Sequence, residues 1–140
     1  MPMRSDVEDL NRPLVQFALF ALGHAAQSVV PGGGPLVPFA MTQSGEKPDL
    51  HRFAGDLEVG QEQAREYVRQ AGKLRRAAVA WDGFLTFDGR RTDAVFVEAS
   101  GDGEPQSMVL AQPYRKVGFI RKRTEAIGDS VLVGSGAPLF

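Results

Sequence analysis

Cysteine is absent from the 140-residue sequence, and histidine occurs only twice, at His24 and His51. The absence of cysteine excludes disulfide-stabilised scaffolds, zinc sites built from thiolates, and thiol nucleophiles. A histidine-rich metal site would need both histidines together with carboxylates. The sequence therefore predicts no metal and no cofactor.

An excess of charge of either sign is also missing. The chain has 16 Lys and Arg residues against 17 Asp and Glu residues, which gives a formal net charge of -1 at pH 7. A balanced chain has no global electrostatic attraction to nucleic acid or to anionic membranes. Only local patches can serve such partners.

No hydrophobic run suggests a membrane-spanning segment. The apolar run at 14–22 is interrupted by Gln16 and is shorter than the roughly 20 residues that a spanning helix needs. The residues before it carry more acids than bases, whereas a secretory signal requires a positive flank. The sequence therefore predicts no membrane contact and a cytoplasmic location.

The residues that are present fit a single α+β domain spanning 1–140. The hydrophobic share of 43% and the charged share of 24% are close to globular averages. Capping signals, the spacing of apolar residues and turn-forming Gly, Pro and Asp residues divide the chain into elements. The predicted helices span 11–28 and 60–75, and the predicted strands span 36–43, 49–54, 77–87, 92–100, 106–114, 117–122 and 131–133.

The element order, α-β-β-α-β-β-β with one or two further strands, predicts an antiparallel β-sheet with two main helices. Three local features are expected within it. Pro38 places its strand at an edge or at a bulge, because proline cannot donate to a ladder. Asp88-Gly89 predicts a tight hairpin turn, and Asp82-Gly83 indicates a bulge.

The central strands are apolar on both faces, whereas a half-solvated antiparallel sheet would alternate to polar residues on one side. Two layers must therefore cover the sheet. The first helix is also apolar around more than one stripe, which indicates burial on several sides. If both helices lie on one face, a second subunit covers the other face, and a homodimer follows.

The helix at 60–75 is amphipathic, with charged residues on its outer side. Glu62 precedes Arg65 by three positions, and Glu66 precedes Arg69 by three positions. This spacing allows ion pairs along a helix surface. We therefore expect both pairs on the exposed side of the helix.

Asp82 and His51 are the candidate residues for chemistry. Asp82 is flanked by apolar residues, and a buried carboxylate needs a partner or a role. His51 and Asp49 share a strand face, which fits half of a metal site or an ordinary polar edge strand. One alternative function is therefore a small enzyme or a small-molecule-binding protein. Its pocket would lie between the first helix and the sheet and use Asp82, His51 and an arginine.

A basic stretch at 114–123 supplies a second alternative, in which the chain binds single-stranded nucleic acid. Basic side chains interleaved with aromatic rings are what such binding requires. The same pattern also suits an edge strand protected from aggregation by charge, which makes nucleic acid the less favoured partner. The candidate binding residues are Arg115, Lys116, Arg121, Lys122 and Arg123.

No group of residues has the pattern of a catalytic set. The favoured interpretation is therefore a non-catalytic protein-interaction domain that acts as a homodimer. Its contacts are expected from the first helix or from a face of the sheet, because the apolar surface there exceeds what one helical layer can cover.

Overall fold

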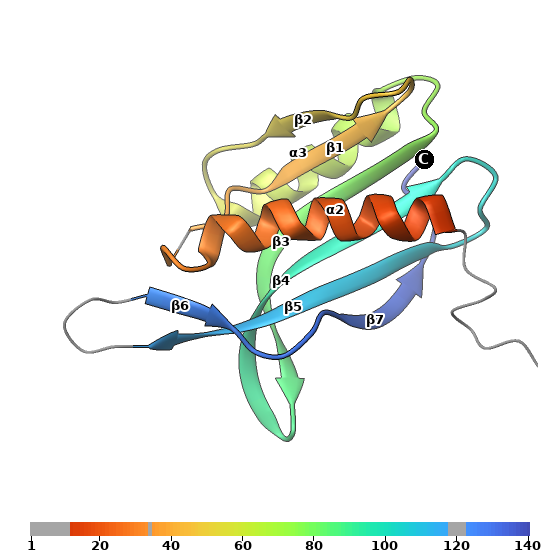
Figure 1. The fold of residues 1–140 in the computed structure, drawn as a ribbon. Coiled ribbons are helices and arrows are strands. Elements are labelled where there is room, and N and C mark those ends of the chain that lie inside the picture. The colour runs from red at the N-terminus through yellow and green to blue at the C-terminus, as the bar shows by residue number, and fades with distance from the viewer. Residues whose placement is uncertain (1–11, 34, 118–122) are drawn as a thin grey trace, which may run out of the picture.

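The fold combines one large antiparallel sheet with two helices (Figure 1), and the computed structural model describes residues 12–33, 35–117 and 123–140. The helices are α2 (Arg12–Val29) and α3 (Leu57–Gln70). The strands are β1 (Phe39–Gln43), β2 (Asp49–Arg52), β3 (Arg76–Phe87), β4 (Arg90–Gly101), β5 (Ser107–Val117), β6 (Arg123–Ala126) and β7 (Val131–Gly136). The predicted α+β class is confirmed.

Neighbouring strands follow the order β2-β1-β3-β4-β5-β6, and β7 also pairs with β5. The longest pair, β3 and β4, is joined by Asp88 and Gly89, whose φ angles are 51° and 75°. Two successive positive φ angles are the mark of a type I′ turn, which matches the twist of an antiparallel hairpin. The predicted hairpin is therefore confirmed.

The expected bulge at Asp82-Gly83 was wrong. Asp82 lies opposite Val95 and Gly83 lies opposite Ala94, so the register of β3 with β4 continues without a shift. The glycine serves packing instead, because a Cβ at Gly83 would lie 3.2 Å from the ring of Phe96. The missing side chain lets that ring lie close over the strand.

Pro38 lies directly before the first residue of a central strand and does not mark an edge strand. β1 lies between β2 and β3, and it begins at Phe39 rather than at the predicted position 36. Phe39 pairs with Ala80, so Pro38 would be the next residue to pair with β3. Proline has no N–H to donate to the ladder, and the pairing of β1 with β3 stops at Phe39. The Pro38 carbonyl instead accepts the N–H of Phe53 at 2.9 Å.

The two helices lie on opposite faces of the sheet (Figure 1). α2 packs over β3, β4 and β5, whereas α3 packs over β1 and β3. The alternation of β3 separates the two cores, since Ala78 and Ala80 face α2 while Ala77 and Val79 face α3. Each helix therefore supplies one of the two layers, and the arrangement with both helices on one face does not occur.

α2 buries one stripe, not several as expected. Leu19 and Phe20 on its outer side are exposed, and the helix carries no charged residue after Arg12. The buried stripe has helical spacing and consists of Leu14, Phe17, Ala18, Ala21, Leu22, Ala25 and Val29.

No helix among the described residues combines the length and the apolarity needed to cross a bilayer.

α3 begins and ends earlier than the predicted helix at 60–75. The Asp56 side chain caps its start by accepting the backbone N–H groups of Glu58 and Val59. Such a cap satisfies donors that have no partner within the helix. The chain leaves the helix after Gln70 and turns at Gly72, whose φ is 81°.

The last strands also differ from the prediction. β5 extends to Val117, and residues 118–122 of the strand predicted at 117–122 lie outside the described residues. β7 is longer than the predicted 131–133. After β7, Leu139 is buried in the core beneath α3, and its N–H donates to the Ser100 hydroxyl at 2.9 Å. This contact ties the end of the chain to β4.

Candidate functional site

Asp82 has the partner that its apolar surroundings require. The Tyr114 hydroxyl donates to both carboxylate oxygens of Asp82, at 2.8 Å and 3.0 Å. Tyr114 belongs to β5 and is buried in the core beneath α2. Since β4 lies between β3 and β5, the hydrogen bond reaches across a strand and ties the two outer ones together.

Burial raises the pKa of both groups. Loss of water raises the pKa of the Asp82 carboxyl, the hydrogen bond from Tyr114 opposes that rise, and the charge of Asp93 adds to it. The pKa of Tyr114 is raised first by burial and then by its bond to Asp82. A phenol that stays neutral acts as a hydrogen-bond donor, so the pair acts as a tether between strands.

Replacing Tyr114 by Phe is expected to lower the free energy of unfolding at neutral pH by about 1 kcal/mol, because Asp82 loses a donor while water still screens its exposed half. The raised pKa means that the folded state holds the Asp82 proton more tightly than the unfolded state does. Ionisation of Asp82 therefore costs stability as the pH rises from the ordinary carboxyl range to the raised value.

This cost is larger in the Tyr114→Phe variant, so its deficit is expected to be greatest at neutral pH and to shrink in mild acid. Urea unfolding at the two pH values measures the deficit. In the Asp82→Asn background, the same substitution should lose its pH dependence. A deficit that stays constant with pH when Asp82 is present would contradict the expectation.

His51 lies on the other face of the sheet. It pairs with Ala40 of the core beneath α3, and its Nε2 is 2.7 Å from the Tyr67 hydroxyl oxygen. Asp49 shares the strand face as expected, but within the described part of the chain no group of three His, Asp or Glu residues could hold a metal.

The pocket expected between the first helix and the sheet is therefore not formed by the predicted residues. The Asp82 side chain points to the α2 face, where it meets Tyr114, whereas His51 points to the α3 face, where it meets Tyr67. The strand period of two places them on opposite sides, and a single cavity cannot take both.

The basic stretch falls only partly within the described residues. Arg121 and Lys122 lie outside them, and Arg123 opens β6 opposite Val117. Lys116 is exposed on β5. The sequence prediction of a separate strand at 117–122 thus gives way to a longer β5 and a return strand.

Arg115 and Tyr114 have partners within the fold. The Arg115 guanidinium pairs with Glu125 of β6, with Nε 2.7 Å from the carboxylate oxygen. The Tyr114 ring is buried and its hydroxyl is bonded to Asp82, so it cannot stack on a base. These contacts match a charged edge more closely than a stacking platform for single strands.

An ion pair between a partly exposed arginine and a buried carboxylate on the α3 face was not predicted from the sequence. Arg65 of α3 bonds Glu98 of β4 at 2.8 Å, in place of the expected pairing with Glu62. Glu98 is only 8% exposed, and its other oxygen accepts the Ser107 hydroxyl at 2.5 Å. β7 also comes close, since a Cβ at Gly136 would lie 3.0 Å from that carboxylate.

Aromatic rings border this ion pair. Trp81 and Phe96 stack with their centroids 5.5 Å apart and their planes at 6°, and the Arg65 guanidinium lies 5.3 Å from the Trp81 ring centroid. The sequence held one signal for the pair, because Glu98 alternates with Phe96 and Ser100 on a face that is otherwise buried. A carboxylate in that position requires a cation.

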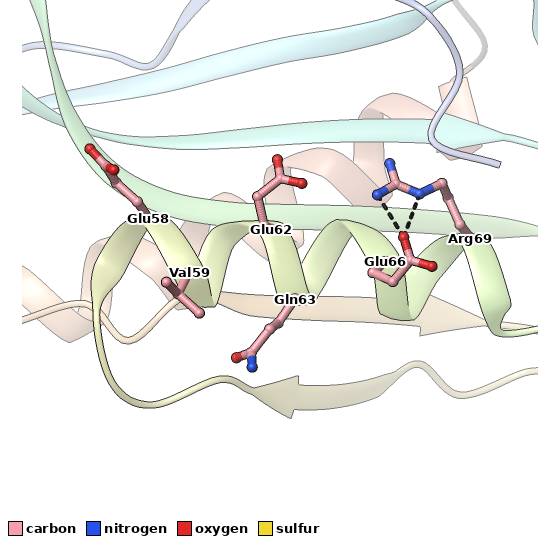
Figure 2. A pocket seen from close by; sticks show the side chains of 6 residues that line it. All are labelled: Glu58, Val59, Glu62, Gln63, Glu66 and Arg69. Carbon is pink, nitrogen blue, oxygen red and sulfur yellow. Dashed lines mark hydrogen bonds and ion pairs between the residues drawn. The ribbon is translucent and has the colours of Figure 1, made fainter.

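The outer side of α3 carries an acidic row. Figure 2 shows Glu58, Glu62 and Glu66 at successive turns of the helix. These residues line a hollow of about 520 Å³. Arg69 bonds Glu66 at 2.8 Å, which confirms the second predicted pair. The bonds from Arg69 and from Gln70 lower the pKa of the Glu66 carboxyl.

Part of the sheet on the α3 face is not covered by this helix. Trp81 lies at the border of the helix-covered region, and a third apolar cluster continues beyond it over β4, β5 and β7. Phe96 and Ala111 are buried there, while Val109 and Val131 are partly exposed. An apolar cluster that α3 does not cover thus lies at one end of this face.

Comparison of the chain with protein-family models, with curated proteins and with solved structures finds no significant match.

Proposed function

We propose that this chain is a non-catalytic protein-interaction domain that acts as a homodimer. The observation that carries the proposal is the edge formed by β7. Leu132 and Val133 of this strand are 55% and 49% exposed, and the sequence contains no charged residue from Ser130 to Phe140. An uncharged edge strand with exposed apolar side chains is prone to pair with another chain.

The opposite edge of the sheet supports this choice by contrast. β2 places Asp49, His51 and Arg52 along its four residues. Charged and polar side chains of this kind protect an edge from pairing. The two edges of the sheet thus differ in charge: β2 carries charged side chains that oppose pairing with another strand, whereas β7 carries none.

A second copy of the same chain is the occupant that suits β7. Two identical strands can pair antiparallel around a twofold axis, which makes the contact self-complementary. No charge repulsion opposes this pairing, because the strand carries no charge. The contact would extend the sheet and bring together the partly exposed clusters around Val109 and Val131.

The proposal is tested by light scattering and native mass spectrometry of the full chain over a range of micromolar concentrations. We expect a dimer, and we expect Leu132→Lys to weaken its association by about tenfold or more, because the lysine would place a charge on the pairing strand of both copies. Leu19→Lys, on the exposed outer side of α2, is the matched control and should leave the dimer intact.

Two results would reject the proposal. If the chain is monomeric at the highest concentration, the homodimer is rejected. If Leu19→Lys dissociates the dimer and Leu132→Lys does not, the dimer contact lies on the first helix and not on the β7 edge.

A further inference from the structure

A second edge of the sheet is open at the end of β3. β1 covers β3 only as far as Ala80, where Phe39 is the last partner before Pro38. Among the described residues, the positions from Trp81 to Phe87 pair with β4 on one side and with no strand on the other. Alternate backbone N–H and C=O groups along this edge therefore lack a strand partner.

The first turns of α3 lie opposite this open edge. A groove runs between them, with α3 as one wall and the edge of β3 as the other. The groove has a volume of about 620 Å³ and is bordered by Leu57 and Glu58 on the helix side and by Trp81 and Phe84 on the strand side. Leu57 and Phe84 are exposed large apolar residues. The groove thus offers apolar walls next to an unpaired strand.

Among the residues that the structure describes, the charges that line the groove are all negative. Asp56, Glu58 and Asp82 border it, and its described lining includes no lysine or arginine. The Asp56 carboxylate already accepts two N–H groups at the start of α3, so the positive end of the helix is compensated. Arg91, which stacks on Phe84 with its guanidinium 3.7 Å from the ring centroid, lies outside the lining.

We infer that this groove binds an extended peptide of a partner protein in which basic and apolar residues alternate. The peptide adds as a strand to the open edge of β3, and its backbone bonds the unpaired groups there. Successive side chains of the added strand point to opposite faces of the sheet. Its apolar side chains contact Phe84 on one face, and its lysine or arginine side chains face Asp56 and Glu58 on the side of α3. This groove and the β7 edge lie on different strands, so the inference does not depend on dimer formation.

The inference is tested by fluorescence anisotropy with the full chain and a labelled hexapeptide of alternating lysine and valine. We expect saturable binding that weakens with added salt, because charge contributes to it. The same peptide with alternate N-methylated amides should not bind, since it cannot donate to a strand edge. A peptide of alternating glutamate and valine should not bind either.

Glu58→Lys is the variant that addresses the groove, and it is expected to weaken binding by about tenfold, because one attraction becomes a repulsion. Glu62→Lys makes the same change one turn further along α3, outside the groove lining, and should bind like the unmodified chain. Circular dichroism checks that both variants keep their fold.

Three results would overturn the inference: no saturable binding of the lysine-valine peptide, equal binding of the N-methylated peptide, or equal losses in the two variants. The second result would indicate attraction by charge without strand addition. The third would indicate a diffuse response to the acidic side of α3. The oligomeric state is measured separately, so a monomeric chain that binds the peptide would reject only the dimer.

Discussion

Replacing Arg65 by methionine is expected to lower the free energy of unfolding at neutral pH by about 3 kcal/mol. Methionine keeps much of the length and apolar volume of the arginine stem, so the change isolates the charge. The cost arises because Glu98 remains buried without its cation while still accepting the Ser107 hydroxyl. Urea unfolding of the full chain measures the loss.

Two further variants separate the buried charge from other effects. Arg69→Met removes the exposed Arg69–Glu66 pair on the same helix, whose side chains are both 51% exposed, and should cost less than about 1 kcal/mol. Combining Arg65→Met with Glu98→Gln should recover much of the loss, because the isolated charge is then gone. If Arg65→Met and Arg69→Met lower the free energy of unfolding equally, the burial of Glu98 does not contribute to the loss.

Gly60→Ala is expected to destabilise the chain by about 2 kcal/mol. Helix propensity alone favours the opposite sign, since alanine within a helix is better than glycine by about 1 kcal/mol. The structure reverses the sign, because a Cβ at Gly60 would lie 2.7 Å from the Phe53 carbonyl oxygen and 3.2 Å from Pro38 Cγ. The helix or the segments around Phe53 and Pro38 would have to move.

Gly23→Ala is the matched control for this substitution. Gly23 lies within α2, and a Cβ there would meet nothing within 4 Å. Propensity then decides the outcome, and the variant should gain up to about 1 kcal/mol. Thermal or urea unfolding of the two variants measures whether each substitution raises or lowers the free energy of unfolding. Stabilisation by Gly60→Ala would show that α3 can shift freely over Pro38.

Local signals in the sequence determined much of the fold. Asp88-Gly89 specified the β3–β4 turn through its two positive φ angles, and the apolar periodicity located both helices. The ends of the elements were less secure. The apolar spacing predicts that α3 starts at residue 60, whereas the Asp56 cap makes it start at Leu57. Pro38 favours an edge strand, whereas the strand that follows it is central.

The candidate site was predictable only in part. Asp82 was recognised as a carboxylate in apolar surroundings, but its partner is 32 residues away on β5. His51 and Asp82 were expected in one pocket, and the sheet places them on opposite faces. The sequence predicts Glu62, three positions earlier, as the partner of Arg65, whereas the fold pairs Arg65 with Glu98.

The sequence by itself determined the class of the fold, the absence of cysteine chemistry and the excess of apolar surface on the central strands. These properties follow from composition and from interactions between neighbours along the chain. The tertiary structure decided which helix covers which face, which charges are buried together, and where β3 and β7 leave open edges. Those outcomes depend on contacts between residues far apart in the sequence, which short-range patterns do not encode.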